Sequence, residues 1–194
     1  MRLGDIAIVR SGLVLARKQA KENPVHKYPL LTLRAVKQDA YLDFNALEEF
    51  RSSEHLNSEY LTHAGDIIIR LSTPYTAILI DERSEGIVIP SSFAIIRTDQ
   101  RQLLPEYLFW LLNTPKVRQQ IYENTTGNML SGVKPSYFND FKVDNLPIEK
   151  QKKVAELNET ARYEVKLLTE LAAMKEKYYA HIIDRTQKEM KRGN

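Results

Sequence analysis

The sequence predicts an α+β fold, with a mixed, β-rich domain over residues 1–146 and one long C-terminal coiled-coil helix over residues 147–194. Two observations lead to this prediction. Short runs rich in β-branched residues, separated by turn residues, fill the middle of the chain. After Pro147 no Gly or Pro occurs until Gly193, which gives a helix of roughly 65 Å. Such a length is typical of a coiled coil and unusual in a small globular domain.

The long run carries helix signals at its start and an apolar row along one face. Pro147 suits the first helical turn, and Glu149 suits the positive end of the helix dipole. The row advances in steps of three and four residues and consists of Val154, Leu157, Ala161, Val165, Leu168, Ala172, Tyr179 and Ile182. This spacing predicts a seam packed against another helix. A helix lying along its own domain is disfavoured, because a compact domain would cover only part of the length.

The β-rich part is predicted to contain short strands, two helices and several loops. Strands are expected at residues 29–36, 67–69, 76–80, 87–89, 93–97 and 141–146, helices at Pro105–Asn113 and 115–122, and one helical turn at 135–138. Residues 3–10 mix apolar and charged side chains and end at the turn signal Ser11-Gly12. The acidic stretch 38–58 is expected to be a surface excursion with partial helix, and residues 124–132 a polar loop.

Composition argues against an enzyme, a cofactor and a metal centre. The 194 residues include no cysteine, so thiol nucleophiles and thiolate metal sites are excluded. The sequence has no glycine-rich phosphate loop, and its four histidines lack metal-ligand spacing. No run approaches the roughly 18 apolar residues of a membrane span. We therefore expect a cytoplasmic protein with no catalytic residue, no cofactor, no metal and no membrane partner.

Charge is distributed unevenly along the chain. Net charge is +3, but residues 1–38 carry eight Lys and Arg against two acidic residues. Residues 39–66 carry one basic residue against seven acidic ones. A mixed-sign surface with a basic first segment is compatible with a polyanionic partner without requiring one.

The order of motifs resembles one known family. Residues 62–82 read THAGDIIIRLSTPYTAILIDE, residues 86–121 read GIVIPSSFAIIRTDQRQLLPEYLFWLLNTPKVRQQI, and residues 146–168 read LPIEKQKKVAELNETARYEVKLL. Together they resemble the target recognition domain and long helix of specificity subunits of type I restriction-modification systems. The chain departs from the family at Ser11-Gly12-Leu13-Val14, where a Gly-x-Thr-Pro loop is usual, and at Leu146, where a second Pro is usual. It also carries one domain and one helix where the family has two of each, which indicates a half-subunit form.

The resemblance implies a non-catalytic reader of double-stranded DNA. In the family, the long helices pair antiparallel, hold two recognition domains apart, and dock DNA methyltransferase subunits. In full systems a restriction subunit joins them. A half-subunit would restore this arrangement as a homodimer, and two identical readers predict a palindromic, bipartite target.

Candidate DNA contacts lie on three loops and, for Arg34, on the strand expected at residues 29–36. The candidates are Arg17, Lys18, Arg34, Arg70, Ser72, Thr73, Tyr75, Asn128, Lys134, Ser136 and Tyr137. Lys and Arg would bind phosphate or guanine, Asn128 would pair with adenine, and the two tyrosines would flank a distorted or extruded base. Two other interpretations stay open. One is a stand-alone DNA-binding regulator or anti-restriction module. The other is a coiled-coil assembly protein whose domain binds protein.

Overall fold

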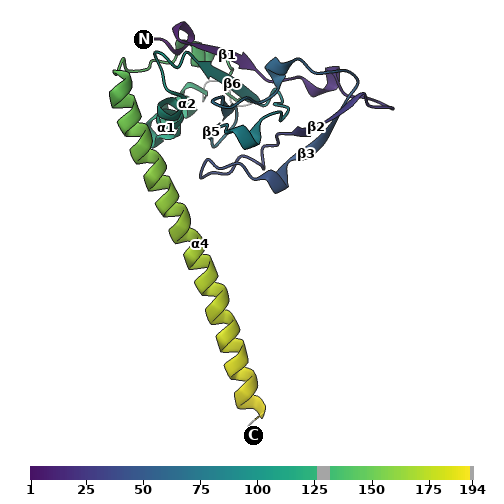
Figure 1. The fold of residues 1–194 in the computed structure, drawn as a ribbon, viewed down its shortest axis with the longest axis vertical. Helices are drawn as coiled ribbons and strands as arrows, with labels where there is room; N and C mark the ends of the chain where they lie inside the picture. Colours follow the sequence, from purple (N-terminus) through teal and green to yellow (C-terminus); the bar gives the residue numbers. More distant parts are fainter. Residues whose placement is uncertain (126–131, 193–194) are drawn as a thin grey trace. The chain divides into compact units, whose positions relative to one another are not determined.

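The computed structural model describes residues 1–125 and 132–192, and the chain falls into two compact units. The unit Met1–Lys152 contains two small sheets and several short helices (Figure 1). The unit Lys153–Asn194 contains the greater part of one uninterrupted helix, α4, which spans Ile148–Arg192. The predicted α+β fold class and the long C-terminal helix are both confirmed.

The core of the first unit is a four-stranded antiparallel sheet in the order β1-β6-β4-β5. Its strands are β1 (Ala7–Ser11), β6 (Phe93–Thr98), β4 (Ile67–Arg70) and β5 (Ala77–Leu79). The central strands are buried on both faces, with Ile68 opposite Ile95 and both fully covered. Such strands read as continuous apolar runs without alternation. This explains why β4, β5 and β6 were predictable from composition.

A two-stranded antiparallel sheet pairs β2 (His26–Leu30) with β3 (Glu48–Ser52). Tyr28 lies opposite Phe50, and Phe50 belongs to a second apolar cluster with Leu13, Leu30, Leu56 and Val88. The isolated bridge between Leu30 and Val88 connects this sheet to the rest of the unit.

Short helices complete the first unit. The α-helices are α1 (Pro105–Asn113), α2 (Pro115–Thr125) and α3 (Tyr137–Asp140), and the 3-10 helices are η1 (Leu3–Asp5), η2 (Leu15–Arg17), η3 (Phe44–Ala46), η4 (Ser58–Tyr60) and η5 (Glu82–Ser84). The amide group of Asn113 accepts from the Ala77 N–H and donates to the Ala77 carbonyl, at 3.2 and 3.0 Å. These two bonds tie the end of α1 to β5.

Several local predictions were wrong. The strand expected at 29–36 is β2, which begins at His26 and ends at Leu30. It ends there because the Thr32 hydroxyl accepts a hydrogen bond from the Ala35 N–H and holds a turn. The acidic stretch 38–58 has no α-helix; it contains η3 and the unpredicted strand β3. The first segment forms β1, which is also missing from the prediction. Both missed strands are specified by partners distant in sequence.

Two further expected strands are only extended segments. Residues 87–89 are buried, but Val88 makes isolated bridges to Leu30 and Leu61 and belongs to no named strand. In residues 141–146 a single bridge joins Lys142 to Arg2. The turn expected at 135–138 is the short helix α3, two residues later in the chain.

The first turn of α4 is held by the buried side chain of Gln151. Its Oε1 accepts from the Leu104 N–H at 2.9 Å, at the N-terminus of α1. Its Nε2 donates to the carbonyls of Gln102 and Leu146, at 2.9 and 2.8 Å. Gln151 is 0% exposed, and these three bonds satisfy two backbone groups of the segment 102–104 and one at Leu146.

We predict that Gln151→Leu lowers the free energy of unfolding by about 2–4 kcal/mol, because it leaves buried backbone groups without partners. Chemical denaturation of the purified protein measures the change. The matched control is Gln119→Leu, at an exposed glutamine on α2, which should shift stability by less than about 0.5 kcal/mol. Equal losses in both variants would contradict the anchoring role.

Candidate nucleic-acid interface

Two of the loops expected to contact DNA lie side by side. The Leu71 carbonyl, just after β4, accepts from the Val133 N–H at 2.9 Å. A Cβ on Gly132 would lie 1.9 Å from the same carbonyl oxygen, so this close approach requires glycine. The turn 71–75 and the segment 132–137 therefore form one continuous surface, which we call the paired-loop surface.

The turn 71–75 has a fixed and unusual backbone. The Thr73–Pro74 peptide is cis, and Tyr75 has a φ of 55°. The Tyr75 N–H donates to the Ser72 carbonyl at 2.9 Å. Tyr75 is only 5% exposed, and its hydroxyl lies 3.1 Å from the Thr125 hydroxyl at the end of α2. Tyr75 is thus packed beneath the turn, and its contact with a base stays a prediction that would require the turn to open.

Arg70 connects the turn to a third loop. Its Nη2 donates to the Thr73 carbonyl at 3.1 Å, and its Nη1 donates to the Leu33 carbonyl at 3.4 Å. Burial lowers the pKa of the Arg70 guanidinium. Arg34 follows Leu33 and extends into solvent, where it pairs with Glu48 at 2.9 Å. Arg70 therefore connects the turn to the segment that precedes Arg34.

The segment 132–137 presents polar groups of different character. Lys134 and Ser136 are exposed, and no carboxylate within residues 1–125 and 132–192 pairs with the Lys134 ammonium group. Tyr137 stacks edge-on against the buried ring of Phe138, with centroids 5.3 Å apart. Burial raises the pKa of the Tyr137 phenol. Its hydroxyl has no hydrogen-bond partner among the described residues.

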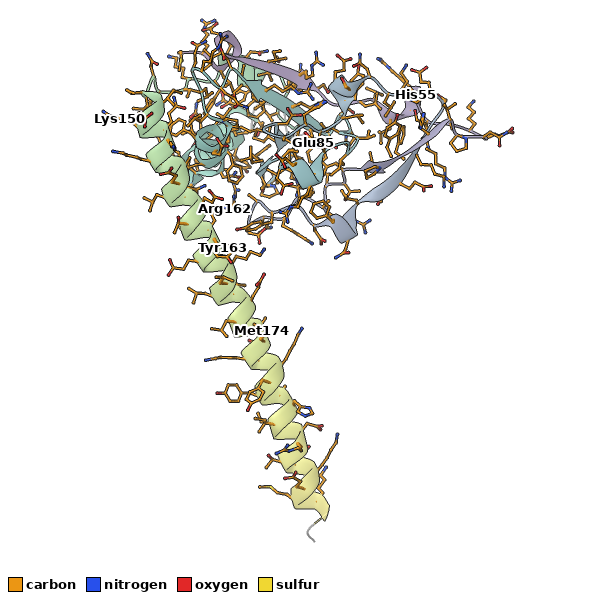
Figure 2. The ribbon with its side chains drawn as sticks, viewed as in Figure 1. His55, Glu85, Lys150, Arg162, Tyr163 and Met174 are labelled. Atoms are coloured by element: carbon orange, nitrogen blue, oxygen red, sulfur yellow. The ribbon has the colours of Figure 1, made fainter. Side chains whose placement is uncertain are left out.

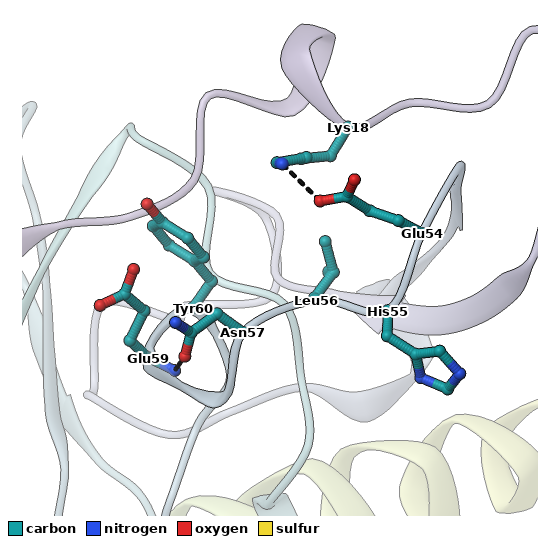
Figure 3. Close-up of a pocket in the computed structure, with 7 residues that line it drawn as sticks. All are labelled: Lys18, Glu54, His55, Leu56, Asn57, Glu59 and Tyr60. Atoms are coloured by element: carbon teal, nitrogen blue, oxygen red, sulfur yellow. Dashed lines mark hydrogen bonds and ion pairs between the residues drawn. The ribbon is translucent and has the colours of Figure 1, made fainter.

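The remaining candidates do not join this surface. Lys18 forms an ion pair with Glu54, and its carbonyl accepts from the Ser53 N–H at 2.8 Å, so the loop 15–18 lies against the end of β3 (Figure 3). Arg17 is exposed on η2 beside it. Asn128 lies outside the described residues.

Much of the basic charge of residues 1–38 is matched by the acidic stretch that follows. Five ion pairs join residues 1–38 to residues 39–66: Arg10–Glu59, Lys18–Glu54, Lys27–Glu49, Arg34–Glu48 and Lys37–Asp43. Exposed pairs of this kind contribute little stability, but they neutralise one another's field. The first segment is therefore less attractive to a polyanion than its sequence suggests.

Sequence reasoning missed Gly132 and Thr125, which fix the two sides of the paired-loop surface. The dipeptide Ser131-Gly132 is a turn signal, so a close backbone approach at Gly132 was open to prediction. The partner of that approach, Leu71, is 61 positions away and has no signal in the sequence.

The predicted seam of α4 consists of solvent-accessible side chains. Leu157, Val165, Leu168 and Tyr179 are between 57% and 71% exposed. Ala161 and Ala172 are exposed, and Val154 and Ile182 are partly exposed. On the polar faces, Lys166–Glu170, Arg185–Glu189 and Asp184–Lys188 form ion pairs four residues apart.

A second apolar row runs along another face of α4. It consists of Tyr163, Leu167, Leu171, Met174 and Tyr178, each between 45% and 61% exposed. At about 100° per residue, this row lies roughly a third of a turn away from the seam. Tyr163 and Met174 project from the helix in Figure 2. In the sequence, Leu171 and Tyr178 form a parallel row that widens the apolar stripe of the seam, but the other members of this second row were not predicted.

The fold is the one found in specificity subunits of type I restriction-modification systems. The HsdS subunit from Thermoanaerobacter tengcongensis aligns with a TM-score of 0.68 at 18% identity, over 89% of this chain and 44% of that chain. A chain from a structure of the type I R-M system, concerned with its complex assembly and conformational transition, gives the same TM-score and coverage at 17% identity. The type I restriction-modification S subunit from M. genitalium aligns with a TM-score of 0.53 at 13% identity, over 86% of this chain and 40% of that chain.

These likenesses confirm the resemblance at the level of fold, and the chain spans less than half the length of each of these neighbours. No protein-family model and no curated protein matches the sequence. Within the described residues, none of the helices combines the length and apolar character needed to cross a bilayer.

We predict that Gly132→Ala separates the two loops, because the added methyl group would collide with the Leu71 carbonyl. The expected loss of stability is about 1–3 kcal/mol, typical of overpacking against fixed atoms. Amide exchange should show the Val133 N–H losing protection while the Ile95 N–H in β6 keeps it. Unchanged protection at Val133 would contradict the required close approach.

Proposed function

We propose that this chain is a non-catalytic DNA-recognition subunit, in half-subunit form, of a type I restriction-modification complex. The observation that carries the proposal is the structural likeness over 89% of the chain. An alignment of that extent must include residues of both units, because Lys153–Asn194 is more than a fifth of the sequence. The likeness therefore concerns the combination of a recognition-type domain with a long helix, in the order that the sequence motifs predicted.

Under this proposal, the paired-loop surface reads DNA. Lys134, Ser136 and Thr73 are exposed on it. Lys134 supplies an ammonium group with no internal carboxylate partner in the described chain, which suits a phosphate contact. Ser136 and Thr73 supply hydroxyl groups for base edges or phosphates. Arg70 acts mainly as a positioning residue, since both of its terminal nitrogens bind backbone carbonyls.

The seam of α4 supports self-association. Its exposed Leu, Val and Tyr side chains would gain stability from burial against a second long helix. Leu168 lies near the middle of α4, so antiparallel pairing of two copies brings the two Leu168 side chains close to the two-fold axis. Two identical reading surfaces would then face a palindromic target whose gap is set by the helix pair.

The second apolar row suits a different partner. A seam occupied by a second copy leaves Tyr163, Leu167 and Met174 on another face of the same helix. We assign this row to docking of the DNA methyltransferase subunit, with the restriction subunit joining the assembled complex. Two rows on separate faces allow both partners to bind at the same time.

We predict that Lys134→Ala weakens duplex binding about uniformly across sequences and reduces the slope of log K against log salt by about 1, because one phosphate contact is lost. Fluorescence anisotropy at several salt concentrations, with the methyltransferase subunit present, measures both quantities. Lys142→Ala removes the same charge outside the paired-loop surface and should leave the slope unchanged. Identical slopes for Lys134→Ala and the parent protein would remove Lys134 from the interface.

We predict that Leu168→Asp weakens dimerisation at least 100-fold, or about 2.7 kcal/mol, because it places two carboxylates near the two-fold axis of an apolar seam. Sedimentation equilibrium measures the dimer constant. The matched variant is Leu167→Asp, the same change one residue earlier but on the second row. It should keep the dimer and lose methyltransferase binding in a pull-down.

Leu168→Asp and Leu167→Asp test separately the assignment of the seam to self-association and of the second row to methyltransferase docking. Dimers of equal strength in both variants would place the self-association surface elsewhere. A parent chain that stays monomeric at micromolar concentration would overturn the half-subunit form, while leaving DNA reading by the paired-loop surface open to its own test.

A further inference from the structure

Two histidines that are far apart in the sequence converge at one edge of the two-stranded sheet. His26 begins β2, and His55 lies three residues beyond the end of β3. Their Nε2 atoms are 2.5 Å apart, and their ring centroids are 3.6 Å apart with the planes inclined by 57°. The two rings therefore overlap at close range, with their outer nitrogens in contact distance of each other. This pair has no part in the paired-loop surface or in the rows of α4.

The backbone on both sides of the pair is held in place. His26 lies opposite Ser52 in the β2–β3 register. The buried Ser52 hydroxyl donates to the Glu54 carbonyl at 2.7 Å, which directs the chain after β3. The Leu56 N–H then donates to the Tyr28 hydroxyl at 3.2 Å, back on β2. His55 is therefore fixed between two anchored residues, and its position relative to His26 is set by the sheet.

The surroundings of the pair leave it open to solvent. His55 is exposed and His26 is partly exposed. The neighbouring Glu54 carboxylate is engaged by Lys18, and the His55 side chain points away from that ion pair (Figure 3). Within the described residues, no group of three or more His, Asp and Glu side chains gathers in a metal-binding arrangement. The protein thus offers two imidazole nitrogens here, with room for water around them.

We propose that His26 and His55 form a two-histidine chelate for a first-row divalent ion of the Zn²⁺, Ni²⁺ or Cu²⁺ type. Imidazole is a preferred ligand for these ions, whereas Mg²⁺ and Ca²⁺ prefer oxygen. Zinc–nitrogen bonds of about 2.0–2.1 Å in a tetrahedral site place two ligand nitrogens about 3.4 Å apart. The two Nε2 atoms need to separate by about 0.9 Å to reach that spacing, and the exposed rings need to turn so that both nitrogens face one ion. Water molecules complete the coordination shell.

Metal binding at this point would fasten β2 to the segment that follows β3. A ligand that binds the folded state and not the unfolded chain stabilises the fold in proportion to its concentration and affinity. The expected effect is local, at the two-stranded sheet. It does not depend on the proposed role in DNA recognition.

The test is isothermal titration of the full 194-residue chain, freed of metal with a chelator, with ZnCl₂ and with NiCl₂. We expect one equivalent to bind to the parent protein. His26→Gln and His55→Gln should each weaken binding at least tenfold. The matched control, His181→Gln, removes an exposed histidine from α4 and should bind as the parent does.

A second measurement uses the unmodified protein. Addition of zinc should shift the imidazole NMR resonances of His26 and His55 and leave those of His63 and His181 in place. It should also raise the thermal midpoint of the parent protein but not that of His55→Gln. No binding by the parent below 1 mM metal, on the order of the weakest physiological metal sites, would overturn the proposal. Unchanged affinity in either His26→Gln or His55→Gln would overturn it equally.

Discussion

A single α-helix has no interior, and α4 keeps most of its apolar side chains accessible to water over 45 residues. Ion pairs four residues apart contribute only about 0.2–0.5 kcal/mol each to such a helix. Burial of its two apolar rows against partners is the larger source of stability available to it. Under the proposed function, the separation of the rows on two faces would let one helix bind a second copy and a different subunit without competition between them.

The first unit, Met1–Lys152, is organised by the opposite condition, complete burial. Ile67, Ile68 and Ile69 of β4 have no solvent exposure, and the next residues, Arg70 and Leu71, begin the paired-loop surface. The turn 71–75 therefore starts at a strand whose isoleucines are completely buried. Leu71 is bound on both sides, since its N–H donates to the Ser92 carbonyl and its carbonyl accepts from the Val133 N–H. A loop supported in this way can hold side chains in position for a partner without folding on contact.

Features that depend on local chemistry were predictable from the sequence, and features that depend on distant pairing were not. The start of α1 follows from Pro105 in its first turn, and β4 follows from three consecutive isoleucines. The strand β3 escaped prediction because Glu48, Glu49 and Arg51 face solvent and only its register with β2 specifies a strand. Tyr75 was assigned to the surface because its neighbours are turn residues, yet its ring packs beneath the turn against Thr125. The contact between the two loops at Gly132 depends on tertiary structure, and so does the proximity of His26 and His55.

Charge placement decides which basic residues remain available to a polyanion. The basic segment 1–38 and the acidic segment 39–66 contact each other. Five ion pairs between them neutralise most of the excess positive charge of residues 1–38. If the chain binds DNA as proposed, long-range attraction comes from cations that have no carboxylate neighbour, and Lys134 is one such cation on the paired-loop surface. Arg34 has a divided role, because its pairing with Glu48 would compete with any phosphate. Under the proposed function, an uncompensated cation on the paired-loop surface favours a defined docking orientation over diffuse attachment.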